Sequence, residues 1–250
     1  MQLRDGFRAH PRCALGFSGG TDSAYLLWAG LDAGADIRPV FVRTPFQTGE
    51  ECRRAEEFCQ KLGRELTILE TDPLSEPAIR ANPPDRCYHC KRGIFSLLCQ
   101  WAGERSIPTV LEGSNASDDL SDRPGMRAIR ELGVESPLRL CGLTKEAIRE
   151  NSRQAGLPTW DLPSSACLAT RFPTGRQITR EDLARVERGE VLLRQRGFSD
   201  LRIRLREWGG LLQLPVEQHP AAKRDWQELE RMLREDFPTL RLDPKGRKSL

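Results

Sequence analysis

The sequence predicts an α/β fold, with a parallel sheet in a first domain and a small α+β C-terminal domain. Three observations support this prediction. Apolar strands alternate with amphipathic helices as far as Leu111, a glycine turn directly follows the first strand, and the pattern changes near Ile178. A chain of 250 residues has room for one domain of about 150 residues and a smaller one.

The first domain begins with an apolar strand at residues 14–17, a turn at 18–23 and the start of a helix at 24–28. Further strands are expected at 37–42, 66–69 and 109–111, a helix at 49–62, and a polar loop at 112–119. Strands that alternate with helices predict parallel pairing with right-handed crossovers. Ligands of such sheets bind at the carboxyl ends of the strands, where the glycine turn lies.

The second domain is expected to contain a helix, two strands, a helix and a last strand. Their predicted ranges are 178–195, 201–205, 211–214, 225–234 and 240–242. We therefore assign residues 1–170 to the first domain, residues 171–243 to the second and residues 244–250 to a disordered tail. The second domain is expected to serve substrate binding or oligomerisation, and the protein to be a homo-oligomer.

Charge and cysteine content narrow the class of protein. The formal net charge is +3, and residues 171–250 hold 18 Lys or Arg against 13 Asp or Glu. This mild basic excess suits an anionic ligand, although most of it is expected to be solvated surface. The first twelve residues show no secretory signal and no apolar run reaches membrane length, so we expect a cytoplasmic protein without a membrane partner. In a reducing compartment, clustered members of the eight cysteines are candidate metal ligands or nucleophiles.

The glycine turn has the composition of a phosphate site. It consists of Ser18, Gly19, Gly20, Thr21, Asp22 and Ser23. Adjacent glycines allow successive N–H groups to point into one concavity, and the start of the next helix adds partial positive charge. No Lys follows the glycines, so the spacing differs from that of the common P-loop. An ordinary polar turn is the alternative.

A second signal is the pair Cys87 and Cys90. Residues 82–85, Asn-Pro-Pro-Asp, favour a helix start with Asp85 as its cap, which would put both thiols on one face of the first turn. A helix N-terminus favours the thiolate that metals require, and Cys167 is the best candidate for a third ligand. A structural cysteine pair is the alternative. The remaining cysteines are expected to be small apolar side chains: Cys13, Cys52, Cys59, Cys99 and Cys141.

The turn resembles the pyrophosphate loop of the ATP pyrophosphatases, the PP-loop superfamily, whose domain is of the adenine nucleotide α-hydrolase-like type. The wider chain resembles the LarE-type ATP-dependent sulfur transferases, in particular a three-cysteine [4Fe–4S] type. The matching stretches are residues 16–23, 87–91, 112–115, 120–125, 135–138 and 160–169.

This resemblance implies a pyridinium carboxylate mononucleotide as the substrate, with ATP and Mg²⁺ as cofactors. The carboxylate would be adenylylated at the loop and then converted to a thiocarboxylate, as in the synthesis of a nickel-pincer cofactor. The sulfur would come either from Cys167 itself or from sulfide on a cluster held by Cys87, Cys90 and Cys167, in which case a sulfide donor is a possible partner.

The resemblance extends into the second domain with one departure. Arg202 and Arg204 match a strand that binds the substrate phosphate, and residues i and i+2 of a strand share one face. Glu190 matches an acidic helix position of the substrate site. A family carboxylate associated with metal binding is replaced by Gln213, which favours the cluster type.

Two other functions remain open from the sequence. Some enzymes with a pyrophosphate loop thiolate tRNA and also use three cysteines and a cluster. That reading is disfavoured, and a nucleic-acid partner is not expected, because the N-terminal part is slightly acidic. A non-catalytic sulfur or iron carrier that binds a nucleotide or metal is the alternative outside enzymes.

Overall fold

A computed structural model describes residues 3–118, 124–163 and 165–247. The chain divides into two compact units. One comprises residues 1–73 and 85–162, and the other comprises residues 74–84 and 163–250. The first unit contains a four-stranded parallel sheet between helices, which confirms the predicted α/β class. No helix among the described residues is long and apolar enough to cross a membrane.

The sheet of the first unit has the strand order β3-β2-β1-β4. Its strands are β1 (Arg12–Gly16), β2 (Asp36–Arg43), β3 (Thr67–Glu70) and β4 (Thr109–Leu111). The first strand along the chain pairs in parallel with both β2 and β4, so that Leu15 stands opposite Pro39 and Leu111. The carboxyl ends of β1, β2 and β4 therefore lie along one edge of the sheet.

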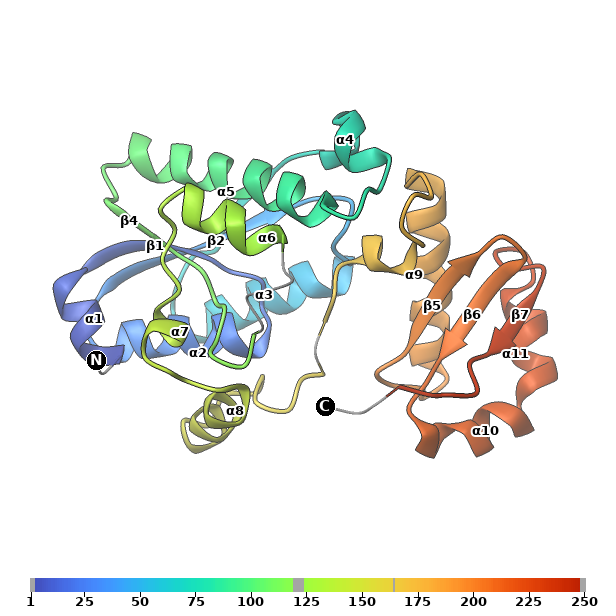
Figure 1. Ribbon diagram of the computed structural model, residues 1–250. Helices are drawn as coiled ribbons and strands as arrows, with labels where there is room; N and C mark the ends of the chain where they lie inside the picture. The colour runs from blue at the N-terminus through green and yellow to red at the C-terminus, as the bar shows by residue number, and fades with distance from the viewer. Residues whose placement is uncertain (1–2, 119–123, 164, 248–250) are drawn as a thin grey trace. The chain divides into compact units, whose positions relative to one another are not determined.

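Helices cover both faces of this sheet (Figure 1). The helices of the first unit are α1 (Leu3–Ala9), α2 (Thr21–Asp32), α3 (Gly49–Lys61), α5 (Arg86–Glu104), α6 (Pro124–Glu131), α7 (Pro137–Leu140) and α8 (Lys145–Gln154). On one face Leu15 and Phe41 pack with residues of α2 and α3. On the other face Ala14 and Val40 pack with residues of α5 and α6. This alternation follows from the two-residue period of a strand.

Helix starts follow local capping chemistry. Thr48 accepts a hydrogen bond from Glu51 N, and the Glu51 side chain accepts one from Thr48 N, so α3 begins with a capping box. The helix predicted to begin at Ile178 begins instead at Arg180, because Thr179 is its N-cap and accepts from Asp182 N.

The second unit contains a three-stranded sheet of order β5-β6-β7. Its elements are α4 (Pro77–Arg80), α9 (Arg180–Gln195), β5 (Arg202–Arg206), β6 (Gly209–Gln213), α10 (His219–Arg224), α11 (Trp226–Leu233) and β7 (Leu240–Leu242), with short 3-10 helices at Leu168–Arg171 and Val216–Gln218. A further 3-10 helix, Pro73–Ser75, begins at the last residue of the first unit before the chain enters the second. The pair β5 and β6 is antiparallel, whereas β6 and β7 are parallel. A Cβ atom at Gly189 of α9 would lie 2.8 Å from Ile203 Cδ1, so this glycine allows α9 to pack closely on β5.

The division of the chain differs from the domain ranges expected from the sequence. Residues 74–84, which we assigned to the first domain, belong to the second unit. Backbone hydrogen bonds from Gly175 N to Asn82 O and from Ile178 N to Arg80 O, 2.8 and 2.9 Å long, join them to that unit. Such long-range bonds leave no periodic pattern in the sequence. Local patterns therefore could not predict that residues 74–84 join the second unit.

The expected disordered tail also needs correction. Arg247 N donates to Leu214 O over 2.7 Å, and the Arg247 guanidinium donates to Asp200 Oδ1 over 2.8 Å. Residues 244–247 are therefore tied to the second unit, whereas residues 248–250 lie outside the described residues.

Two glycines of the second unit provide a matched test of its packing. Gly209 has φ +141°, and an added Cβ would lie 2.1 Å from Thr239 O, a backbone atom. Gly175 also has a positive φ, +82°, but an added Cβ would meet nothing within 4 Å. Gly175→Ala should lower the free energy of unfolding by about 1–2 kcal/mol through backbone strain. Gly209→Ala should cost a further ~1–3 kcal/mol from the clash. Urea denaturation measures both, and equal losses would contradict the close approach at Thr239.

Candidate functional site

The glycine turn connects β1 to α2 through a backbone that requires glycine. Gly19 has φ +71°, and a Cβ there would lie 3.1 Å from the Cβ of Ala55. Gly20 is the N-cap of α2, and the first backbone bond of that helix runs from Ala24 N to Gly20 O. The N–H groups of residues 21–23 precede this bonding pattern and are available to an anion.

The two serines of the turn brace it from within. The Ser18 and Ser23 hydroxyl oxygens lie 3.1 Å apart, and Ser18 N donates to Ser23 Oγ over 3.3 Å. Gly20 N donates to Ser18 Oγ over 3.4 Å. These contacts close the turn before any ligand binds.

Thr21 has a different role from that expected of a phosphate-binding hydroxyl. Its side chain is buried, and its Oγ1 donates to Thr159 O over 2.8 Å. The hydroxyl therefore holds the segment that follows α8, and only the backbone of Thr21 contributes to the anion-binding end of the helix.

Asp22 faces a lysine that comes from far along the chain. Lys145 Nζ donates to Asp22 Oδ2 over 2.8 Å. The other oxygen, Asp22 Oδ1, is buried and has no hydrogen-bond partner among the described residues. A buried carboxylate oxygen without a partner fits a ligand of Mg²⁺, which prefers carboxylates and phosphates.

The loop after β4 packs against this helix start. A Cβ at Gly113 would lie 3.2 Å from Ser23 N, so the close approach depends on glycine. The adjacent Glu112 is buried and accepts hydrogen bonds from Ser114 N, Ser114 Oγ and Ser136 Oγ. Gly113 of the predicted polar loop thus lies beside the turn, and the structure describes this loop as far as Asp118. Asp119 and the family-like stretch at residues 120–123 lie outside the described residues.

A cavity of about 280 Å³ lies where β2 ends and α3 begins. Its lining includes Arg43 and Thr44 from the end of β2, and Thr48, Cys52 and Arg53 from the start of α3. Its volume is close to the lower limit of ligand pockets, about 300 Å³. The cavity follows β2, and the glycine turn follows the neighbouring strand β1, so both lie at the same edge of the sheet.

The cysteine pair lies in the first turn of α5, as the sequence indicates. Cys87 is exposed and Cys90 is half-buried. The guanidinium of Arg86 donates to Cys87 Sγ over 3.6 Å. Asp85 is at the N-cap position, but it makes no capping hydrogen bond, because its carboxylate lies 3.3 Å from His89 Nε2. The expected capping role of the Asp85 side chain is therefore wrong.

Cys167 belongs to the second unit, unlike the pair on α5. Among the residues that the structure describes, no three His, Cys, Asp or Glu side chains lie close enough together to hold a metal ion. The first unit thus supplies two thiols on one helical turn, and the third expected ligand comes from the other unit.

Four of the other cysteines have environments that keep their thiols protonated. Burial raises the pKa of both Cys13 and Cys59 to about 12. Burial also raises the pKa values of Cys99 and Cys141. These thiols are poor nucleophiles at neutral pH, in contrast to what a sulfur-transfer or metal-binding cysteine requires.

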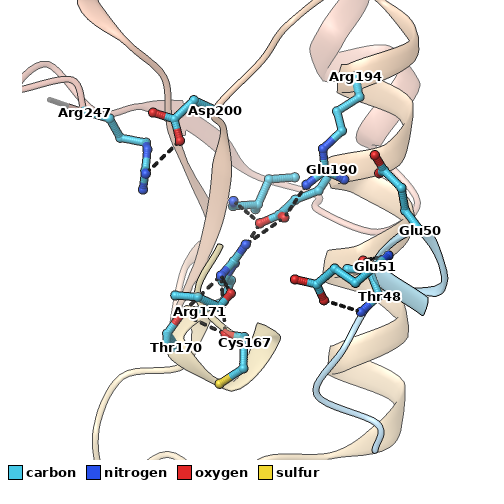
Figure 2. A network of polar contacts seen from close by, with 12 residues as sticks. Thr48, Glu50, Glu51, Cys167, Thr170, Arg171, Glu190, Arg194, Asp200 and Arg247 are labelled. Carbon is cyan, nitrogen blue, oxygen red and sulfur yellow. Dashed lines mark hydrogen bonds and ion pairs between the residues drawn. The ribbon is translucent and has the colours of Figure 1, made fainter. Parts of the chain in front are cut away.

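A buried ion pair fixes the backbone of Cys167 (Figure 2). Arg171 Nε and Nη2 donate to the two oxygens of Glu190 over 2.9 and 3.0 Å. Nη1 of the same guanidinium donates to Ala166 O over 2.6 Å and to Cys167 O over 3.3 Å. The sulfur of Cys167 points away from this network (Figure 2). Arg171 therefore holds the peptide that carries the Cys167 side chain.

Glu190 differs from its expected place in the substrate site. Its side chain is fully buried, and it also accepts from Ile203 N over 3.0 Å and from Arg194 over 3.3 Å. The two oxygens of Glu190 thus face Arg171, Arg194 and Ile203 N, and Glu190 positions the Arg171 guanidinium.

Arg202 and Arg204 lie on one face of β5 and are both half-buried. Burial and then the nearby charges of Arg247, Arg171 and Arg204 lower the pKa of Arg202 to about 10. Burial, followed by the charge of Arg171, also lowers the pKa of Arg204. The positive charges of these neighbouring arginines repel one another, and a bound anion would reduce that repulsion. This arrangement is the one expected of a phosphate site.

Gln213 completes the surroundings of Arg204. Arg204 Nε donates to Gln213 Oε1, and Gln213 Nε2 donates to Asp243 Oδ2, both over 2.6 Å. The amide thus connects the guanidinium to a carboxylate. The family pattern has a carboxylate associated with metal binding at this position. Here Gln213 stands in its place and forms this hydrogen-bonded bridge.

Two residues of these sites were missed from the sequence. Lys145 is the first residue of α8, where the helix dipole disfavours a cation. A lysine at this unfavourable position was a signal in the sequence that could have identified it. Arg171 follows Cys167 within a polar stretch and gives no local sign of burial. Its role depends on Glu190, which lies 19 residues away.

No family model matches the chain. An uncharacterized protein of Synechocystis sp. is 35% identical over 218 residues, which cover 86% of this chain and 81% of that protein. A pyridinium-3,5-bisthiocarboxylic acid mononucleotide synthase of Lactiplantibacillus plantarum is 32% identical over 206 residues, 82% of this chain and 75% of the synthase. An uncharacterized protein of Methanocaldococcus jannaschii is 29% identical and covers 86% of this chain and 81% of its own length.

The buried ion pair leads to a stability prediction. Glu190→Gln should lower the free energy of unfolding by about 3–5 kcal/mol, because it leaves the Arg171 guanidinium buried without its counterion. Glu150→Gln is the control, since its pair with Arg153 is exposed and its loss should leave the denaturation midpoint unchanged. Urea unfolding followed by circular dichroism measures both variants. A midpoint for Glu190→Gln equal to that of the wild type would contradict the assigned role.

Proposed function

The chain belongs to the LarE family, which includes the pyridinium-3,5-bisthiocarboxylic acid mononucleotide synthase, and we propose that it is an ATP-dependent sulfur transferase. Its substrate would be a pyridinium carboxylate mononucleotide, and its product the corresponding thiocarboxylate. The observation that carries the ATP dependence is the glycine turn at the start of α2, with the buried Asp22 Oδ1 that has no hydrogen-bond partner among the described residues.

The first unit has the features needed to bind ATP. The backbone N–H groups of residues 21–23 would receive phosphate oxygens, and the cavity lined by Thr44 and Arg53 would receive the nucleoside. Asp22 would hold Mg²⁺, whose chemistry when bound is to offset negative charge on the phosphates. Ser18 and Ser23 would keep the turn in shape through their mutual contact.

The proposed first step is adenylylation of the substrate. A carboxylate oxygen attacks the α-phosphorus, the new bond from oxygen to phosphorus forms, and the bond to the β-phosphate breaks. Pyrophosphate leaves with the bonding electron pair. An oxygen of a free carboxylate is a poor leaving group. In the acyl adenylate it leaves as part of AMP, so that sulfur can attack the acyl carbon.

The second unit would provide sulfur and hold the substrate phosphate. Arg202 and Arg204 would bind the phosphate through paired N–H donors. The Cys167 thiolate would attack the acyl carbon and displace AMP, which gives a thioester. Loss of the Cα proton of Cys167 with cleavage of its bond from Cβ to sulfur would then release the thiocarboxylate and leave dehydroalanine. Throughout, Arg171 would fix the Cys167 carbonyl.

The pair on α5 supports a second source of sulfur. We infer that Cys87, Cys90 and Cys167 are the ligands of a [4Fe–4S] cluster. The exposed Cys87 thiol, its contact with Arg86 and the helix N-terminus suit two thiolate ligands. When bound, such a cluster has one iron without a protein ligand, which can carry an additional sulfide.

The function is tested by separating its two halves. With ATP, Mg²⁺ and pyridinium-3,5-dicarboxylate mononucleotide, the wild type should release pyrophosphate and yield a product in which sulfur replaces oxygen. Cys167→Ala should still release pyrophosphate but form no thiocarboxylate, because it lacks the thiol. Cys99→Ala should retain both activities. Pyrophosphate release and mass spectrometry measure them, and thiocarboxylate formation by Cys167→Ala at the wild-type rate would exclude this role for Cys167.

The cluster is tested by an iron and sulfide count on protein reconstituted anaerobically. About four iron atoms per chain are expected for the wild type. Cys87→Ser and Cys90→Ser should each reduce that number, because each removes one thiolate ligand, whereas Cys141→Ser should not. Absence of iron from the reconstituted wild type would leave Cys167 itself as the source of sulfur.

A further inference from the structure

AMP transfer requires positive charge at the phosphates, and the glycine turn itself carries none. Residues 18–23 contain no Lys or Arg, whereas phosphate loops with Lys after the glycines supply a cation from within. Negative charge on the departing pyrophosphate increases in the transition state, and fixed cations there lower the barrier. The structure provides such a cation from another element.

Lys145 is held rigidly at the start of α8. Thr144 caps that helix by accepting from Ala147 N over 3.2 Å. Lys145 N donates to Ser117 Oγ over 3.0 Å, and Ala116 N donates to Leu143 O over 2.8 Å. The backbone of Lys145 is therefore fastened to the loop after β4, which also packs against the start of α2.

The ammonium group of Lys145 lies at the first turn of α2. Its Nζ is 2.8 Å from Asp22 Oδ2, and the two side chains are 23% and 26% exposed. This partial exposure leaves the ammonium accessible to a ligand that enters the turn. A lysine has three N–H donors, so contact with Asp22 does not exhaust them.

Two other cations near the turn already have different contacts. Arg54 Nε donates to Gly19 O over 3.4 Å, and its Nη1 lies 4.0 Å from Glu50. Lys91 Nζ lies 4.0 Å from the buried carboxylate of Glu112. Arg54 thus binds a carbonyl oxygen of the turn and Lys91 pairs with a carboxylate outside it, whereas the ammonium of Lys145 pairs with a carboxylate of the turn itself.

We propose that Lys145 is a phosphate-binding residue of the AMP transfer, a role that rests on the function proposed above. Without nucleotide, Lys145 neutralises Asp22. With nucleotide, its ammonium donates to an oxygen of the bound phosphates and stabilises the charge that moves onto pyrophosphate as the bond to the α-phosphorus breaks. No proton is transferred in this step, so it needs no further proton donor.

The first test compares two lysine substitutions. Lys145→Met should lower the rate of pyrophosphate release by about a hundredfold, the effect typical of losing one fixed donor to a transition-state charge. Lys145→Arg should recover part of that loss because it restores the positive charge. Lys61→Met, at an exposed position near the end of α3, should match the wild type. Wild-type activity in Lys145→Met would overturn the proposal. Absence of pyrophosphate release from the wild type would instead contradict the proposed function itself.

A double-mutant cycle separates direct contact with phosphate from support of Asp22. If Lys145 acts on phosphate, Lys145→Met should lower pyrophosphate release at least about tenfold further in an Asp22→Asn background. If Lys145 only positions Asp22, its removal should have no additional effect there, which would overturn the proposal.

Binding of inorganic pyrophosphate, measured by calorimetry, is the second readout and does not depend on turnover. Lys145→Met should bind it more weakly than Lys61→Met does, and equal affinities would contradict direct contact.

Discussion

Parallel pairing of β1 with both β2 and β4 is the constraint on which the first unit depends. Because the strands run in the same direction, the turn after β1, the cavity after β2 and the loop after β4 lie at one edge of the sheet. The short segment between Gly16 and Thr21 then fixes where α2 begins. Gly19 and Gly113 permit close backbone approaches at this edge. The chemistry attributed to the turn thus derives from strand direction as much as from its own residues.

In the second unit, a buried ion pair organises the surroundings of Cys167. Glu190 receives hydrogen bonds from two arginines and from the backbone of β5, so one carboxylate joins α9, the sheet and the Cys167 segment. Such a pair is costly to desolvate, and its hydrogen bonds to Arg171 and Ile203 offset that cost. Removing either partner would expose the other to an apolar interior, so the geometry at Cys167 and the stability of the unit are linked.

Local patterns in the sequence predicted the parallel sheet and the position of the glycine turn, because strand period, helix period and glycine conformations are properties of neighbouring residues. They did not predict that residues 74–84 join the second unit, or that the Thr21 hydroxyl binds Thr159. They also did not predict that Glu190, which we expected in the substrate site, is fully buried and paired with Arg171. These features depend on contacts between residues far apart in the chain, for which a single sequence carries no periodic signal. Lys145 was missed although its place at the start of α8 was a local signal, because its contact with Asp22 spans 123 residues.

The hydrogen bond from Thr21 to Thr159 gives the turn a mechanical connection to the end of the first unit. Residues 157–162 are the last of that unit before the chain continues toward Cys167, and Arg149 also holds them by donating to Leu162 O over 2.8 Å. Local opening of this segment must break its bond to the first residue of α2. A ligand that rigidifies the turn therefore raises the free energy of that opening and slows amide hydrogen exchange in residues 157–162.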